Sequence, residues 1–392
     1  MKDSSQDGYV WASPGPYEVQ RSFRRRKRNG GIFVLVLFSF IGFMVFGMSY
    51  FASPYVSADA QKGVGYATVA EKEIALVPYR RSGSRGLFQM ITQDTFQVRL
   101  FAVELDTGRR LWDTQLSSMP PGWQAKVITA GARNAYVATD GGLVILDLAT
   151  GDILARDGDI QGLPNPVTSS AAYGYDASST SIVAMSADGG LRTIPLDTVV
   201  AAPAPPELAR TWRSKLSPQR PGTESTSGAS SSHGVLAGRE KVELIPREDV
   251  PGLRLVRRTG NSGGTPIGET VFHEGRLLLT PPPGEVEGKG FPDSSSSAAG
   301  TPAGLVVVQH LRDLNSRNYA VSVVSVQTGQ VVATHPIGPG MNRVLTSPGK
   351  RTLLFADGED SMLGDGLATI GLDGRINWFY LGTIDFFGNP SF

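Results

Sequence analysis

The sequence predicts an all-β fold: a β-propeller of six four-stranded blades, preceded by one transmembrane helix. Three observations predict it. A charge-free apolar run lies near the N-terminus, short apolar runs alternate with polar turns through the rest of the chain, and a strand-turn-strand unit recurs at intervals of roughly 40–50 residues. Seven blades are the alternative, because two insertions interrupt the repeat and could hide another blade.

Composition limits the class of protein. The 392 residues suffice for one large β domain or two ordinary domains. The formal net charge is +1, so the chain as a whole does not suggest a nucleic-acid partner. There is no cysteine, which excludes disulfides, a thiol nucleophile, cysteine-zinc sites and the lipidated cysteine of a lipoprotein.

The N-terminal region predicts a single membrane span. Residues 1–31 are polar and include the basic run RSFRRRKR, so we expect a disordered, basic cytoplasmic tail. Residues 32–51, IFVLVLFSFIGFMVFGMSYF, contain no charge and would form a helix about 30 Å long, the thickness of a bilayer core. Only Asp59 and Lys62 follow closely in the expected linker, residues 52–63. The positive-inside rule then places the N-terminus in the cytoplasm and the globular part outside it, at the cell membrane of a bacterium.

A cleaved signal peptide is the rival interpretation of the same run. The sequence Ala58-Asp59-Ala60 has the small-x-small pattern of a cleavage site. However, the apolar run is longer than a usual signal-peptide core, and some 30 residues precede it. We therefore favour an uncleaved anchor. In either case the globular part lies outside the cytoplasm.

Residues 64–392 are predicted as the propeller. Short apolar runs such as EIALVPYR, GLFQMIT and QVRLFAVELD lack a sustained helical period and are interpreted as strands, and we expect no long helix after residue 51. Pro, Gly and Ser dominate two low-complexity insertions, residues 217–234 and 281–304. The C-terminal TIDFFGNPSF is expected to complete a blade or to cover the edge of the last one. The expected blades are 64–116, 123–160, 166–203, 208–258, 267–338 and 341–382.

The repeat is clearest at its threonine-glycine turns. AVELDTGRRLW (102–112), ILDLATGDILA (145–155) and VVSVQTGQVVA (323–333) share it, TIPLDTVVAA from Thr193 is a degenerate copy, and ATIGLDGRINW ends at Trp378. Neighbouring copies are offset by 43, 48 and 45 residues. Glycine tolerates the positive φ of such a turn. A large ring at the place of Trp112 can pack across the gap onto the neighbouring blade.

This unit resembles the tryptophan-docking motif of the quinoprotein-like (PQQ-like) propellers, A-x-D-x-x-T-G-x-x-x-W. Ala102, Thr107, Gly108 and Trp112 match the motif, and Glu104 replaces its Asp. Partial matches in the later copies are Ile145, Asp147, Thr150 and Gly151, with Ala155 in place of Trp, and then Val323, Thr328, Gly329 and Ala333. The resemblance covers about residues 64 to 382. It implies a propeller whose motif residues join blades and do not bind the quinone.

No residue is identified as catalytic, cofactor-binding or metal-binding, and no cofactor is expected. The four histidines show no metal-ligand spacing, and we interpret them as surface or hydrogen-bonded residues. Asp357, Glu359, Asp360 and Asp365 could supply oxygen ligands to Ca²⁺, but they lack EF-hand spacing and are interpreted as a solvated loop. Whether these four bind Ca²⁺ stays open at this point.

These observations favour a non-catalytic, membrane-anchored propeller that binds or scaffolds envelope proteins or ligands. A propeller lipoprotein of outer-membrane assembly is similar in repeat type and size, and acts as a scaffold, but it lacks this anchor. The alternative is a quinone (PQQ)-dependent dehydrogenase-like enzyme, as the resemblance implies for other members of the superfamily. Such an enzyme would need carboxylates that converge on a central channel.

Overall fold

The structure is a computed structural model. It describes residues 31–52, 56–118, 123–218, 234–237, 240–258, 264–278, 304–315, 317–339, 343–358 and 365–390. The expected basic tail, apart from residue 31, lies outside the described residues. So do most of both low-complexity insertions, and Glu359 and Asp360 of the acidic loop.

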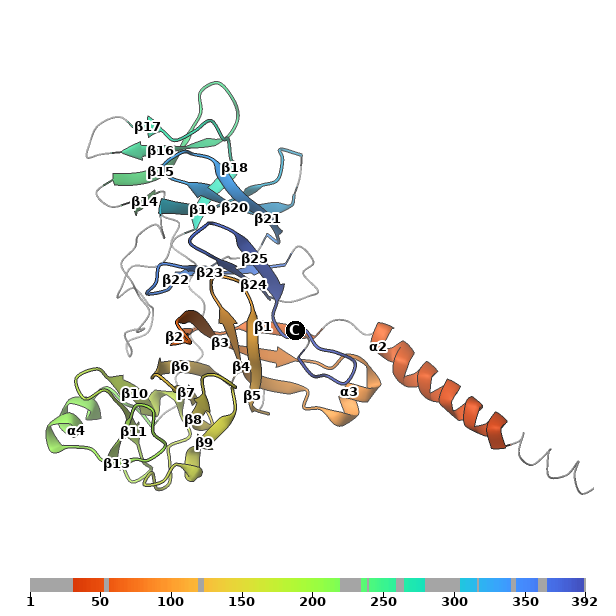
Figure 1. Cartoon of the computed structure of the whole chain (residues 1–392), viewed down its shortest axis with the longest axis vertical. Coiled ribbons are helices and arrows are strands. Elements are labelled where there is room, and N and C mark those ends of the chain that lie inside the picture. The colour runs from red at the N-terminus through yellow and green to blue at the C-terminus, as the bar shows by residue number, and fades with distance from the viewer. Residues whose placement is uncertain are drawn as a thin grey trace, which may run out of the picture.

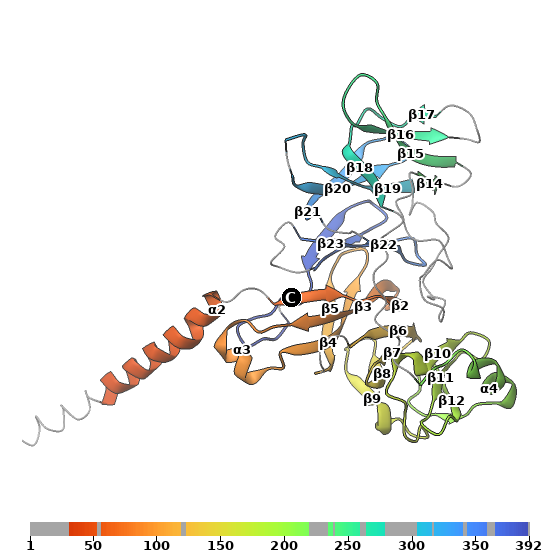
Figure 2. The same ribbon diagram turned by 180° about the vertical axis from the view of Figure 1, so that it is seen from behind.

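One helix, Gly31–Ala52, is long and apolar enough to cross a membrane. It includes a π-helical turn, η1 (Phe43–Gly47), and ends in α2 (Met48–Ala52). Its apolar side chains are mostly exposed; Phe33, for example, is 68% accessible. The helix projects away from the sheets in both views (Figures 1 and 2). A signal sequence near the N-terminus can also be this apolar, so length and apolarity alone do not establish a retained anchor.

The rest of the described chain is mainly β, in six antiparallel sheets. The first sheet has five strands, because β1 and β2 both pair with β3; the other five sheets have four strands each, in sequence order. The bounds are β1 (Ser57–Ala60), β2 (Gly65–Val69), β3 (Lys72–Ser82), β4 (Phe96–Glu104) and β5 (Arg110–Ser117) in sheet 1; β6 (Ala125–Ala130), β7 (Asn134–Thr139), β8 (Gly142–Asp147) and β9 (Ile153–Arg156) in sheet 2; β10 (Tyr173–Asp176), β11 (Ser181–Met185), β12 (Leu191–Pro195) and β13 (Ala202–Pro203) in sheet 3; β14 (Gly234–Ala237), β15 (Glu240–Pro246), β16 (Leu253–Arg258) and β17 (Thr265–Pro266) in sheet 4; β18 (His273–Leu278), β19 (Leu305–Leu311), β20 (Tyr319–Ser325) and β21 (Val331–Ile337) in sheet 5; and β22 (Arg343–Thr346), β23 (Thr352–Asp357), β24 (Asp365–Ile370) and β25 (Ile376–Tyr380) in sheet 6. Six sheets of this kind confirm the predicted propeller fold and its six blades.

Three expectations about local structure need correction. GLFQMIT was expected to be a strand but forms the helix α3 (Gly86–Thr92), because the C-terminal segment packs on it through Phe88 and Gln89. The fourth expected blade, 208–258, begins instead with the helix α4 (Pro206–Arg213), and its sheet runs from β14 to β17. The expected linker, 52–63, contributes the strand β1 to sheet 1. Two short 3₁₀ turns, η2 (Asp157–Asp159) and η3 (Ser170–Ala172), complete the described helices.

The sheets follow one another in an open arc, in the spatial order 4, 5, 6, 1, 2, 3 (Figure 1). An apolar cluster lies between each neighbouring pair. Leu76 and Val137 belong to the cluster between sheets 1 and 2, and Val103 and Leu353 to the one between sheets 1 and 6. Among the described residues, no such cluster joins sheets 3 and 4. Propeller blades commonly close into a ring, and no such closure is found among the described residues.

Helix α4 accounts for the end of the arc at sheet 3. It lies on the side of sheet 3 that faces away from sheet 2 in both views (Figures 1 and 2). Its Trp212 is 6% exposed, shares a cluster with Ile182 and Ile194, and donates a 3.0 Å hydrogen bond from Nε1 to Asp176. A proline at the start of α4 and Arg213 near its end favour the helix at this point. The helix thus covers the face of sheet 3 that a following blade would occupy.

Candidate functional site

The threonine-glycine turns join neighbouring sheets, as predicted. Trp112 on β5 packs onto the turn between β8 and β9, where a Cβ at Gly151 would lie 2.5 Å from its ring. Its Nε1 donates a 2.9 Å hydrogen bond to the carbonyl of Leu148. Thr114, two residues further on, donates to the Gly151 carbonyl at 2.8 Å. Gly151 has φ +76°, so the close approach and the backbone conformation both require glycine.

The other copies repeat this arrangement. A Cβ at Gly108 would meet Asn377 of sheet 6, and one at Gly374 would meet Val332 of sheet 5. In the degenerate copy, the carboxylate of Asp197 replaces the close glycine contact and accepts hydrogen bonds from the backbone N–H groups of residues 132 to 134 in sheet 2. The turn before the last strand of these blades therefore contacts the preceding sheet.

Trp378 packs differently from Trp112, although both stand four residues after the turn glycine. It stacks on His335 of β21, with ring centroids 4.6 Å apart, and so contacts the preceding sheet. It also covers Gly366 within its own sheet. The shared offset therefore places a large ring at a blade junction in both copies, but on opposite sides.

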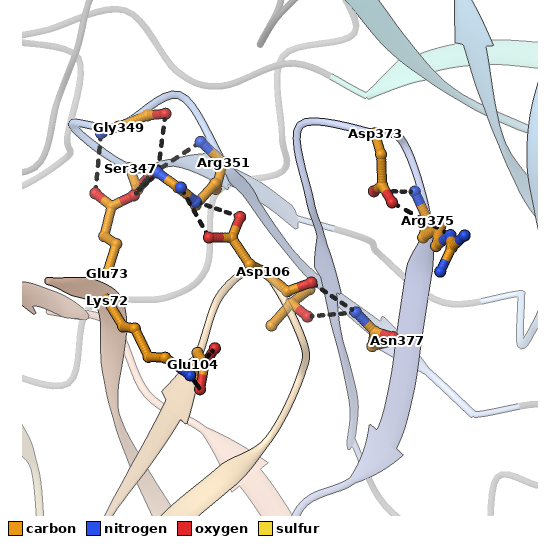
Figure 3. Close-up of polar contacts among 11 residues, drawn as sticks. Lys72, Glu73, Glu104, Asp106, Ser347, Gly349, Arg351, Asp373, Arg375 and Asn377 are labelled. Atoms are coloured by element: carbon orange, nitrogen blue, oxygen red, sulfur yellow. Dashed lines mark hydrogen bonds and ion pairs between the residues drawn. The ribbon is translucent and has the colours of Figure 1, made fainter. Parts of the chain in front are cut away.

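A polar seam joins sheets 1 and 6 at the end of the sheets where the threonine-glycine turns lie, which we call the turn side (Figure 3). We define it as Glu73, Asp106, Ser347, Arg351 and Asn377. Glu73 accepts hydrogen bonds from Ser347 Oγ at 2.8 Å and from Arg351 Nη1 at 3.1 Å, and the Gly349 N–H donates to it at 2.9 Å. Arg351 also forms a two-pronged pair with Asp106, with Nη2 2.8 Å from Oδ2. The Asn377 amide donates to the Asp106 carbonyl.

Glu104, which replaces the Asp of the resembled motif, acts within sheet 1. Its side chain is 4% exposed and lies 3.0 Å from Lys72 Nζ and 3.3 Å from Arg109 Nε. Lys72 is the first residue of β3, and Arg109 lies in the turn between β4 and β5. Glu104 therefore connects the start of β3 with the turn before β5 inside sheet 1, whereas the resemblance implies motif residues that join blades.

A second polar cluster is buried at the opposite end of sheet 1. Arg99 and Asp113 form an ion pair at 2.8 Å, with side chains only 7% and 6% exposed. The Tyr79 hydroxyl donates to Asp113 at 2.6 Å, and burial raises the pKa of Tyr79 well above its usual value. Arg81 donates to Gln93 at 2.7 Å; burial, followed by the nearby Arg99 charge, lowers the pKa of Arg81. These groups link the sheet to the loop that carries α3.

Helix α3 and the C-terminal segment, residues 382–390, form a docking platform for the N-terminal helix. Gln89 is fully buried and donates from Nε2 to the carbonyls of Asp385 at 2.8 Å and Phe386 at 3.2 Å. Phe88 stacks on Phe386, with centroids 5.4 Å apart. The C-terminal segment thus packs on α3, and neither of the two expected roles, completing a blade or covering the edge of the last one, describes this packing.

The base of the N-terminal helix contacts this platform directly. Ser49 Oγ accepts a 3.0 Å hydrogen bond from the Leu87 N–H. Arg85 donates to the Tyr50 hydroxyl at 3.0 Å, and its guanidinium carbon lies 4.0 Å from the Tyr50 ring centroid. A Cβ at Gly86 would lie 2.8 Å from the Tyr50 backbone. Helix and platform are therefore closely packed, a contact that the strand interpretation of GLFQMIT had missed.

The acidic loop is only partly described. Asp357 and Asp365 are cross-strand partners at the ends of β23 and β24. Asp365 accepts a 2.8 Å hydrogen bond from the Ala60 N–H, and its pKa is raised, mainly by burial. Within the described ranges, no group of three His, Asp or Glu side chains is placed to hold a metal ion. Glu359 and Asp360 lie outside those ranges.

His310 and His335 take part in packing. His310 is half-buried; its Nε2 lies 2.8 Å from Ser322 Oγ, and burial lowers its pKa. His335 stacks on Trp378.

A shallow, open hollow of about 560 Å³ lies between sheets 4 and 5, lined by two turns, residues 268–270 and 328–331. It gathers only one charged side chain, Glu269, so we do not assign a ligand to it.

No protein-family model and no curated protein matches the chain. Several solved structures are similar. The β-propeller domain of the trilobed protease from Pyrococcus furiosus is 10% identical and covers 80% of this chain and 93% of its own, with a TM-score of 0.25. A putative TolB from Agrobacterium tumefaciens is 11% identical, with coverages of 69% and 83% and a TM-score of 0.22. Regucalcin, a calcium-binding protein from the same organism, is 12% identical, with coverages of 78% and 83% and a TM-score of 0.22. At these TM-scores the matches carry no argument about function, and the fold rests on the sheets described above.

Proposed function

We propose that this chain is a single-pass membrane protein whose N-terminus lies in the cytoplasm and whose propeller binds or scaffolds envelope proteins or ligands outside it. The helix Gly31–Ala52 supplies the span by its length and apolarity. The basic run at residues 21–28 precedes it, which favours this orientation. In this proposal the propeller has no catalysis of its own.

The position of β1 in sheet 1 supports the proposal that the N-terminal helix is retained as a membrane anchor. Ala58 is fully buried, in a cluster with Val77 and Leu381. Residues 57–60 pair with β3, and Asp365 accepts a hydrogen bond from the Ala60 N–H. Cleavage after Ala60 would remove this strand and expose the apolar surface beneath it. The Ala58-Asp59-Ala60 sequence is therefore better explained as a strand than as a cleavage site.

The proposed binding or scaffold role is supported by the ion pairs of Arg351 and Arg99, which stabilise the fold. Arg351 is held by Glu73 and Asp106, and Arg99 by Asp113, so these charges connect parts of the fold. Propellers commonly present loops at the ends of their strands to partners. A quinone-dependent dehydrogenase remains the alternative from the sequence, but no arrangement among the described residues favours it.

Labelling in intact cells tests the orientation. The chain has no cysteine, so a single introduced thiol is the only site for a membrane-impermeant maleimide. We expect Leu372→Cys, on an exposed turn of sheet 6, to be labelled from outside and Ser4→Cys, in the tail, to be labelled only after lysis. The opposite pattern would refute the orientation.

Crosslinking tests the proposed role. Crosslinking in intact cells followed by mass spectrometry should recover specific envelope proteins with the full-length chain. Turnover of alcohols or sugars by the purified full-length protein, with added pyrroloquinoline quinone and Ca²⁺, would overturn the non-catalytic proposal and support the enzyme alternative.

A further inference from the structure

Exposed apolar side chains gather beside the base of the N-terminal helix. Among the described residues, eleven exposed large apolar side chains lie outside that helix, and four of them belong to α3, the start of β4 and the C-terminal segment. They are Met90, Ile91, Phe96 and Phe387, with exposed fractions of 57%, 68%, 40% and 60%. We call these four the apolar patch. Scattered single residues of this kind are ordinary, but a group on one short helix and its neighbours is not.

The sequence of α3 gives it two different faces. Gln89 points inward and holds the C-terminal segment, and Phe88 stacks on Phe386. Met90 and Ile91, the next two residues, are left in solvent. The inward face fixes the helix to the protein, so the apolar residues of the other face are presented on a rigid support.

The patch is continuous with the helix that we propose spans the membrane. Tyr50 and Ser49, near the end of that helix, contact the loop before α3 and α3 itself. A 22-residue helix is about 33 Å long, slightly more than the bilayer core, so its Ala52 end lies at the lipid interface. Phe51, at the same level, is 72% exposed. Side chains fixed next to this end meet the boundary between headgroups and acyl chains.

We propose that the apolar patch inserts into the lipid interface next to the N-terminal helix. The occupant of the patch is the membrane that the helix crosses, so this inference rests on the proposed anchor. The propeller is then held at one orientation by two contacts, the span and the patch. Its turn side, with the polar seam, faces away from the membrane, because β3 runs eleven residues, roughly 35 Å, from Lys72, the neighbour of Glu73, toward α3.

Depth-dependent quenching tests this placement on the full chain. Ile91→Cys carries an environment-sensitive NBD dye, and Leu372→Cys is the matched control, since Leu372 is an exposed apolar residue (47%) on the turn side. Each protein is reconstituted into vesicles of phosphatidylcholine and phosphatidylglycerol, with or without phosphatidylcholine that bears a doxyl quencher near the headgroup. Met90→Cys is the second test position. Circular dichroism confirms that each variant is folded.

We expect the dye at position 91 to lose most of its emission to the doxyl lipid and to be shielded from aqueous iodide. The dye at position 372 should behave in the opposite way. Quenching of position 91 by iodide and not by lipid, in protein that floats with the vesicles, would overturn the patch but leave the anchor intact. Shielding from both quenchers would mean that protein covers the patch, and would also overturn the inference. Failure to float would overturn the anchor itself.

Discussion

Replacing Trp112 by alanine should weaken the junction between sheets 1 and 2 more than any other single truncation in the repeat. The ring is 5% exposed and packs onto the Gly151 turn, so its removal costs about 3–5 kcal/mol in lost burial and cavity formation. The Leu148 carbonyl also loses its donor, which adds about 1 kcal/mol. Trp112→Phe keeps most of the ring and loses the hydrogen bond, so it should cost roughly 1–2 kcal/mol.

Gly151→Ala tests the same contact from the other side. The new Cβ meets the Trp112 ring and also occupies a backbone with φ +76°. In the protein that keeps Trp112, we expect Gly151→Ala to lower the free energy of unfolding by about 2–4 kcal/mol, from overpacking and backbone strain together. In the Trp112→Ala background the clash with the ring is gone, and only the backbone strain, about 1 kcal/mol, and the contact with Thr114 Oγ1, 2.8 Å from the new Cβ, should remain. The two substitutions should therefore be strongly non-additive.

Two measurements test these predictions on the variants. Urea unfolding of the full-length protein in detergent, monitored by far-ultraviolet circular dichroism, gives the free energy of unfolding. Hydrogen exchange read by mass spectrometry locates the change, and we expect faster exchange at residues 146–153 with little effect in sheet 5. Equal costs for Trp112→Ala and Trp112→Phe, or additive costs with Gly151→Ala, would refute the docking explanation.

Three further predictions concern charge and the platform. Burial raises the pKa of Asp157 to about 6, so ionisation of this carboxyl destabilises the fold as pH rises from about 4 through 6. In unfolding titrations, the free energy of unfolding of Asp157→Asn should therefore exceed that of the unchanged protein by roughly 1–2 kcal/mol at pH 7, a figure reduced for partial solvent exposure. Near pH 4 the two proteins should be equally stable. Arg351→Ala should lose about 1–2 kcal/mol at low salt and less at high salt, with Arg351→Lys intermediate because it keeps the charge but not the fork; a salt-independent loss would count against the polar seam. Gln89→Ala should free the C-terminal segment, seen as faster proteolysis and hydrogen exchange at residues 383–390, whereas Thr92→Ala should not, because Thr92 is exposed and its hydroxyl bonds only to the Phe88 carbonyl within α3.

The repeat units were predictable because each is local. Alternating side chains and a glycine turn within eleven residues define a strand pair, and the spacing of the copies defines the blades. The role of Gly108, Gly151 and Trp112 at blade junctions follows from the same pattern. The identity of the contacted residues does not, because the register between sheets is set by packing across the whole chain.

The parts that were missed depend on distant contacts. Glu73 and Arg351 are 278 residues apart in the sequence, and neither has a local pattern that marks a partner. Helix α3 is only seven residues long, and its apolar residues also suit a strand. What favours the helix is the C-terminal segment that packs on it, which lies almost 300 residues later. Similarly, only the fold reveals that β1 occupies the place of the expected linker.

The retained anchor is tested most directly by the intact mass of the protein extracted from the membranes of the cells that express it. The position of β1 predicts a chain whose mass still includes the helix and residues 57–60. A mature chain that begins at Gln61 would contradict the account, because the folded protein would then lack both the span and the strand that Ala58 anchors in sheet 1.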